Sequence, residues 1–225
     1  MQLPAPAPAP SRPALEAMLD AHAPLAPAPL CPELNAFQGR VLLEVWQAAE
    51  ALAGAALPSP FWAYPWPAGC ALARFLLDDP TLVRGRRVLD IGCGGGVTAL
   101  AAARAGADEV VANDVDPWAL ATLQIAAERQ QLRVRTLLAD LTRDSAALEG
   151  FDLVLCGDLS YERSNASAQR ALLRRFRDAG ARVLAADAGR AYFDADGLQP
   201  LAEYRIRVPS DLEGVEERVA RVYQL

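Results

Sequence analysis

The chain has 225 residues, a formal charge of −6, and a composition that is 52% hydrophobic and 22% charged. These values suit one globular domain with a sizeable core. The acidic balance argues against a surface that follows nucleic-acid phosphates, so we expect no nucleic-acid partner. All 22 basic residues are arginine, which leaves no P-loop or Schiff-base lysine. The one histidine, His22, argues against a His-based triad and a multi-His metal site, so we expect no metal.

The cysteines indicate the compartment. Cys31, Cys70, Cys93 and Cys156 show no CxxC spacing, which is typical of reduced thiols in a cytoplasmic protein. No apolar run approaches the ~18 residues of a membrane span, and the N-terminus lacks the basic start and apolar core of a signal peptide. We therefore expect a cytoplasmic monomer with no membrane partner.

Proline dominates the first part of the chain. Residues 1–33 hold nine of the 17 prolines, which predicts a flexible Pro/Ala-rich leader with at most a short helical turn at 13–20. Apolar periodicity then predicts a helix over 35–55. An aromatic segment, "FWAYPWPAG" at 61–69, is too Pro-rich for a helix interior or a central strand. A further helix is expected at 68–77.

From residue 86 the sequence alternates between strand and helix patterns. Strands are expected at 86–91, 109–114, 134–140, 151–158 and 181–187, and helices at 97–106, 116–130 and 165–180. Continuous apolar strands between helices predict a parallel sheet covered on both faces. Residues 202–208 and 217–225 are expected to add an antiparallel pair. The expected fold is α/β, a doubly wound, mostly parallel seven-stranded sheet. It forms one domain over 34–225, with an α-helical N-terminal extension at 34–80 and a cofactor-binding core at 81–225.

A glycine-rich turn, "DIGCGGG", joins the first of these strands to its helix. In open α/β sheets, ligands bind at the carboxyl ends of the strands, where glycine lets them approach the backbone. The pattern Gly92-Cys93-Gly94 is preceded by Asp90, whose charge would repel a pyrophosphate. That acid suits a ligand with an ammonium group, such as the methionine part of S-adenosylmethionine.

Two further acids follow strands of the same sheet. Asp114, some twenty-two residues after Gly92, is placed to accept hydrogen bonds from ribose hydroxyls, and Asp140 is placed to meet an adenine amino group. Three acids at three strand ends favour S-adenosylmethionine. The alternatives are a nicotinamide enzyme, a fold that has lost its ligand, or acids that only cap helices.

Several motifs carry a more specific resemblance. They are "WAYPWPAG" at 62–69, "VRGRRVLD" at 83–90, "NDVDP" at 113–117, "DLSY" at 158–161 and "ADAGR" at 186–190. With these, residues 32–225 resemble the class I S-adenosylmethionine-dependent methyltransferases. More narrowly, they resemble the protein-lysine methyltransferases of the electron transfer flavoprotein β-subunit. Ala186 and Ala188 stand where that family has glycine and proline.

The resemblance implies roles for residues at the strand ends. Trp66, Gly92, Gly94, Asp114, Asp140, Gly157 and Tyr161 would contact the cofactor, together with Asp90 and Cys93 of the same turn. Asp158 would face the substrate lysine and, with Tyr161, carry the catalysis. For Asp187 and Arg190 we favour a structural ion pair or cap.

Methylation of lysine needs the neutral amine, although free lysine has a pKa near ~10.4. With no suitable histidine, Asp158 is the candidate for capturing and orienting the amine, while positioning supplies most of the rate. The aromatic segment would then form a lid, with Trp66 beside the sulfonium and Trp62 shaping the lysine channel. The expected function is protein-lysine N-methylation, with the flavoprotein β-subunit as the suspected partner. The alternatives are a methyltransferase for another protein or a small amine, and a non-catalytic binding module.

Overall fold

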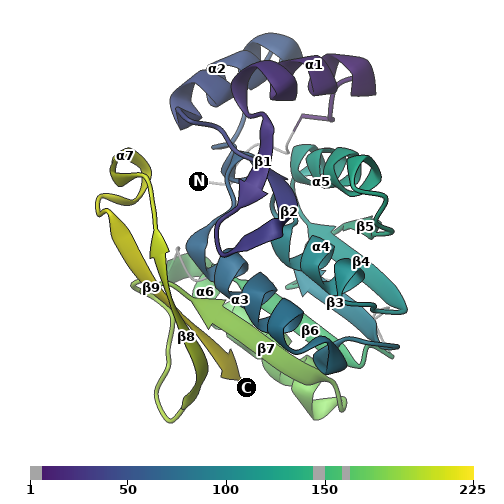
Figure 1. Cartoon of the computed structure of the whole chain (residues 1–225), viewed down its shortest axis with the longest axis vertical. Coiled ribbons are helices and arrows are strands. Elements are labelled where there is room, and N and C mark those ends of the chain that lie inside the picture. The colour runs from purple at the N-terminus through teal and green to yellow at the C-terminus, as the bar shows by residue number, and fades with distance from the viewer. Residues whose placement is uncertain (1–6, 144–149, 159–162) are drawn as a thin grey trace.

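The computed structural model describes residues 7–143, 150–158 and 163–225. Its centre is a seven-stranded sheet in the order β5-β4-β3-β6-β7-β9-β8. Five strands are parallel: β3 (Arg87–Ile91), β4 (Glu109–Asp114), β5 (Arg135–Leu138), β6 (Leu153–Gly157) and β7 (Arg182–Asp187). β8 (Pro200–Arg207) and β9 (Glu217–Gln224) pair antiparallel at one edge. The predicted sheet, including its antiparallel pair, is confirmed (Figure 1).

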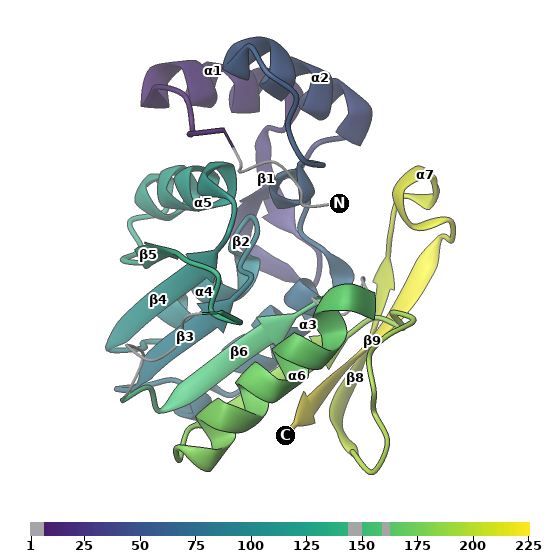
Figure 2. The same ribbon diagram turned by 180° about the vertical axis from the view of Figure 1, so that it is seen from behind.

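Helices cover both faces of the sheet. On one face lie α3 (Pro67–Asp78), α4 (Val97–Arg104) and α5 (Pro117–Arg129). On the other lies α6 (Arg163–Asp178), which is in front of the sheet when the molecule is seen from behind (Figure 2). This arrangement is the predicted doubly wound α/β fold. Each of these four helices begins and ends within a few residues of its predicted bounds.

The N-terminal part differs from the prediction. Residues 12–37 form α1 (Arg12–His22) and a hairpin of β1 (Leu25–Ala28) and β2 (Cys31–Phe37), where a flexible leader was expected over residues 1–33. The chain can order here because Pro13 lies in the first turn of α1, where its missing N–H costs nothing. Leu15, Leu19 and Leu34 are each no more than 1% exposed, so the hydrophobic effect opposes disorder.

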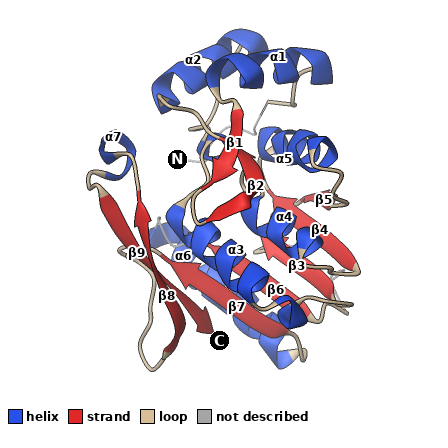
Figure 3. Cartoon of the chain, viewed as in Figure 1, coloured by secondary structure: helices blue, strands red, loops and turns tan. Residues whose placement is uncertain are grey.

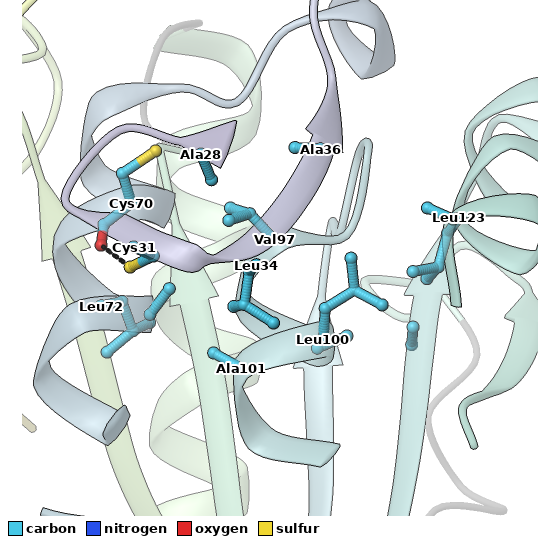
Figure 4. Packing of buried hydrophobic residues seen from close by; sticks show 14 of the residues in the cluster. Ala28, Cys31, Leu34, Ala36, Cys70, Leu72, Val97, Leu100, Ala101 and Leu123 are labelled. Carbon is cyan, nitrogen blue, oxygen red and sulfur yellow. Dashed lines mark hydrogen bonds between the residues drawn. The ribbon is translucent and has the colours of Figure 1, made fainter. Parts of the chain in front are cut away.

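The hairpin lies on the helical layer of the sheet. Leu34 of β2 lies beside Leu72 of α3 and Leu100 of α4, with Leu123 of α5 at the far end of the same cluster (Figure 4). The thiol of Cys31 donates to the carbonyl of Cys70 at 3.7 Å, and all four cysteines are free, as expected. The N-terminal segment is thus part of the core.

The second predicted helix is also shorter than expected. α2 spans Leu42–Ala53, whereas the prediction began at Asn35. Asn35–Phe37 instead pair with β1, and the side chain of Phe37 is 2% exposed. The prediction began too early because the buried strand β2 also supplies apolar residues, and over a short stretch their spacing does not separate a strand from an amphipathic helix.

The aromatic segment connects this extension to the sheet. It contains a short 3₁₀ turn, Phe61–Ala63, and leads directly into α3 (Figure 3). Trp62, Ala63 and Tyr64 are buried. Among the described residues, no helix is long and apolar enough to cross a bilayer.

Candidate functional site

The carboxyl ends of β3, β4 and β6 lie side by side in the middle of the sheet, because β3 pairs with both of its neighbours. The loop after β3 holds three glycines with positive φ, Gly92 at 63°, Gly94 at 52° and Gly96 at 84°. Residues with a Cβ rarely adopt this backbone, so the turn depends on glycine. The amide of Cys93 donates to the carbonyl of Asn113 at 2.9 Å and ties the loop to β4.

Asp114 organises this loop. Its Oδ2 accepts the amide of Gly94 at 2.9 Å and its Oδ1 accepts the amide of Asp116 at 3.0 Å. Burial raises the pKa of Asp114, and the hydrogen bonds from Asp116 and Gly94 act in the opposite direction. A carboxylate at the end of β4 can therefore fix the turn and present further lone pairs to a ligand.

Asp90 lies one residue before the end of β3. Its side chain is 2% exposed, and its Oδ2 has no hydrogen-bond partner. Burial raises its pKa to about 8, although the backbone of Ala99 lowers it. A buried acceptor without a partner is costly, so this atom fits a ligand that brings a donor.

Asp140 follows β5 and is nearer the surface. Its Oδ1 accepts both the amide of Thr142, at 3.1 Å, and its hydroxyl, at 2.5 Å. Its Oδ2 is 3.1 Å from Nε of Arg143. The carboxylate thus closes a local turn, and its role toward a ligand stays a prediction.

Two exposed apolar side chains lie between these acids. Val115, directly after Asp114, is 57% exposed, and Leu138, at the end of β5, is also 57% exposed. Sequence reasoning missed both, because an apolar residue at a strand end is most simply read as core. Asn113 was missed as a positioning residue: its amide group donates to the carbonyls of Leu137 and Ala139, at 3.0 and 2.9 Å, and so joins the end of β4 to the end of β5.

The aromatic segment lies against the glycine-rich loop. A Cβ on Gly95 would stand 2.5 Å from the carbonyl oxygen of Trp62. The Trp62 ring stacks on Trp118 of α5, with centroids 6.1 Å apart and planes 20° apart. Trp62 is thus buried between the loop and α5, and its predicted place in a lysine channel stays untested.

Trp66 lies at the start of α3. Its Nε1 donates to the carbonyl of Phe61 at 2.7 Å, and its ring meets Tyr64 edge-on with centroids 5.3 Å apart. The guanidinium of Arg190 lies over the ring, 5.6 Å from its centroid. The ring is half-buried and accepts a cation on its face.

Asp158 follows β6 in a left-handed conformation with φ 55°. Its Oδ2 accepts the amide of Ala68, in the first turn of α3, at 2.9 Å. Its Oδ1 accepts Nε of Arg190 at 2.7 Å. Burial raises the pKa of Asp158, and the charge of Arg190 lowers it. Gly157 fits closely beside α3, since an added Cβ would stand 3.3 Å from the backbone of Gly69. Tyr161 lies outside the described residues.

Arg190 connects Asp158 to a cluster of charged side chains. Its NH1 and NH2 donate to the two oxygens of Glu213, at 3.1 and 3.0 Å, and Glu213 also accepts Nε of Arg218 at 2.9 Å. Asp187 accepts the amides of Gly189 and Arg190, which matches the predicted cap. No local motif points to Glu213, because it lies 55 residues after Asp158 in the sequence.

Comparison with known proteins shows what this part of the chain resembles. The methyltransferase domain family matches residues 88–186, from β3 to β7. Electron transfer flavoprotein β-subunit lysine methyltransferases are similar in sequence. The match to the Xenopus laevis protein is 41% identical over 65% of this chain and 61% of that one, and the match to the Danio rerio protein is 41% identical over 63% and 55%. The chain therefore spans less than two thirds of the length of these relatives.

Solved structures agree on the fold of the sheet and its helices. A magnesium protoporphyrin IX methyltransferase from Synechocystis, solved with bound S-adenosylmethionine, superposes with a TM-score of 0.50 at 18% identity. The superposition covers 69% of this chain and 77% of that protein. The seven-stranded sheet is thus a Rossmann-like arrangement, as the resemblance implied.

Proposed function

We propose that this protein is an S-adenosylmethionine-dependent protein-lysine N-methyltransferase that acts on the β-subunit of electron transfer flavoprotein. The similarity to enzymes of that name carries the proposal, and it includes residues on both sides of the glycine-rich loop. Family likeness alone does not choose a substrate. The edge of the sheet supplies the chemical argument.

The residues of this edge fit the cofactor. The unpartnered Oδ2 of Asp90 would accept a hydrogen bond from its ammonium group, and Asp114 would accept those of its ribose hydroxyls. Exposed Val115 and Leu138 would cover the faces of its adenine. S-adenosylmethionine, when bound, supplies an electrophilic methyl group on a positively charged sulfur. Asp90, Gly92, Cys93, Gly94, Asp114 and Asp140 are accordingly proposed as its binding residues, with Trp66, Gly157 and Tyr161 as further contacts.

Asp158 is proposed to receive the substrate. A carboxylate has about four lone-pair positions, and two of those of Asp158 are used by Ala68 and Arg190. Its side chain is 8% exposed, so an amine that reaches it leaves bulk water. Loss of hydration disfavours the charged ammonium and favours the neutral nucleophile. Asp158 would orient that amine, with Tyr161 beside it in the sequence.

The test is methyl transfer to purified electron transfer flavoprotein with labelled S-adenosylmethionine. We expect label on lysines of the β-subunit. Because the chain has no lysine, no enzyme side chain can give the same product. Free lysine and small amines are assayed in parallel, and label confined to them would contradict a protein substrate. Asp114→Ala should abolish cofactor binding in calorimetry, while Asp178→Ala, an exposed acid at the end of α6, should not.

A further inference from the structure

The charged cluster at the ends of β6 and β7 bears on the protonation state of the substrate lysine. A lysine bound beside a lone carboxylate is held as an ammonium, because the opposite charge raises its pKa. Methyl transfer needs the neutral amine. A proposed lysine site built on Asp158 alone would therefore oppose its own chemistry.

Arg190 is placed to resolve this conflict. Its Nε is 2.7 Å from Oδ1 of Asp158, and its two terminal nitrogens bind Glu213. Arg218 binds Glu213 from the other side at 2.9 Å. The cluster thus holds two carboxylates and two guanidiniums and has no net formal charge. The Glu213 side chain is 1% exposed and that of Arg190 18%, so solvent screens these charges weakly.

We infer that Arg190 is a positioning residue that neutralises Asp158, so that the substrate amine meets an ion pair instead of a free carboxylate. The inference rests on the function proposed above and adds an electrostatic role for a residue outside the cofactor loop. Arg190 also fixes the carboxylate in direction, since the guanidinium is a rigid donor held by a second carboxylate and by the face of Trp66. Asp158 can then accept from the amine without stabilising its charged form.

The other titratable groups around Asp158 do not replace this effect. Burial raises the pKa of the Cys70 thiol of α3 and of the Cys156 thiol of β6, so both stay neutral at physiological pH. Asp187, the last residue of β7, is a further acid, and its pKa too is raised by burial. Among the described residues that face Asp158, Arg190 is therefore the cation in direct contact.

The hairpin of β8 and β9 supplies the second half of the cluster. β7 ends at Asp187 opposite Arg221, whereas β9 begins four residues earlier, at Glu217. At about 3.4 Å per residue, the hairpin extends roughly 14 Å beyond the end of β7. Glu213 lies in α7 (Ser210–Glu213), at the tip of that hairpin (Figure 1). The tip is thus joined to the candidate lysine site through Arg190.

The test is the pH profile of kcat for full-length enzyme with electron transfer flavoprotein as substrate. Arg190→Gln should move the profile to higher pH by about one to two units, because the bound lysine then keeps its proton more strongly. Glu213→Gln, which removes a negative charge from the same cluster, should move it to lower pH. General damage to the fold does not give opposite shifts.

Two matched variants complete the design. Arg190→Lys keeps the charge and should keep the wild-type midpoint. Arg218→Gln removes a charge from the same Glu213 without touching Asp158, so its upward shift should be smaller than that of Arg190→Gln. If Arg190→Gln does not fold, the opposite shifts of Glu213→Gln and Arg218→Gln still provide the sign test.

Unchanged midpoints, or shifts of Glu213→Gln and the arginine variants in one direction, would overturn the inference. Wild-type enzyme that transfers no methyl group at any pH would instead overturn the proposed function, and the inference with it. Circular dichroism at each pH separates both outcomes from loss of the folded state.

Discussion

The carbonyl oxygen of Trp62 lies directly above Gly95 of the cofactor loop, where a side chain would begin 2.5 Å from it. The aromatic segment therefore rests on the glycine-rich loop, and the two must be ordered together. The segment that the sequence shows as a loop rich in aromatic residues packs, in the structure, against the glycine-rich loop of the candidate site.

The first prediction concerns that contact. Gly95→Ala should lower cofactor affinity at least tenfold, because the new methyl group must displace either the backbone of Trp62 or the loop itself. Overpacking of this kind costs about 1–3 kcal/mol of folding free energy. Calorimetry and urea unfolding measure the two effects. Gly180→Ala, at a positive φ with open space around it, should lose stability alone. Equal cofactor affinity in both variants would show that the loop tolerates the contact.

A second prediction concerns Trp66. Trp66→Ala should weaken cofactor binding, because it removes an aromatic face that accepts a cation and the hydrogen bond to Phe61. It should also loosen Arg190. Trp66→Phe keeps the ring face and loses only the donor, so most of the affinity should return. Unchanged affinity in Trp66→Ala would mean that the segment is only a hydrophobic plug between two helices.

The third prediction concerns Asp90. Burial raises its pKa from 3.8 to about 8, so the folded state binds a proton that the unfolded state releases above pH 4. The stability of the cofactor-free protein should therefore fall as pH rises from about 4 to about 8. Asp90→Asn should flatten this part of the curve, because the amide does not titrate. Urea unfolding at pH 5, 6.5 and 8 measures the slope.

The same substitution should weaken cofactor binding. An amide at Asp90 cannot attract an ammonium group as a carboxylate does, so calorimetry should show a loss that is larger at pH 8 than at pH 5. A variant that keeps both the wild-type slope and the wild-type affinity would show that Asp90 does not titrate between pH 5 and pH 8 and takes no part in cofactor binding.

The fourth prediction concerns the N-terminal segment. Leu19→Ala should cost about 2–5 kcal/mol of unfolding free energy, because Leu19 is fully buried in α1, which packs on α2 and α5. Leu43→Ala is the control: Leu43 is 59% exposed, and the change should be within about 0.5 kcal/mol. If the two variants unfold at the same urea concentration, residues 12–33 do not contribute to the core.

The sheet could be predicted from the sequence because its signals are local. Each strand from β3 to β7 is followed within two residues by glycine or aspartate. Asp116 caps α5 as expected by accepting the amide of Trp118 at 2.8 Å. The acids at the strand ends followed from the same spacing. Composition misled the reading of residues 1–33, where the alanines and prolines that suggest disorder alternate with leucines that the core takes up.

The cluster behind Asp158 could not be predicted in this way. Arg190 and Glu213 are 23 residues apart in the sequence, and they meet because β9 returns antiparallel beside β7 in one particular register. No short motif encodes that register. The "ADAGR" sequence indicates a turn, and only the folded chain shows which carboxylates its arginine binds.

The position of Glu213 also sets an order of events during synthesis. A ribosome that has delivered the strands from β3 to β6 has delivered the whole glycine-rich loop and its acids. The partner that anchors Arg190 emerges more than fifty residues later than Asp158. A nascent chain would thus hold Asp158 and Arg190 without the carboxylate that fixes the guanidinium until its last hairpin closes, and only the finished chain would have the complete cluster.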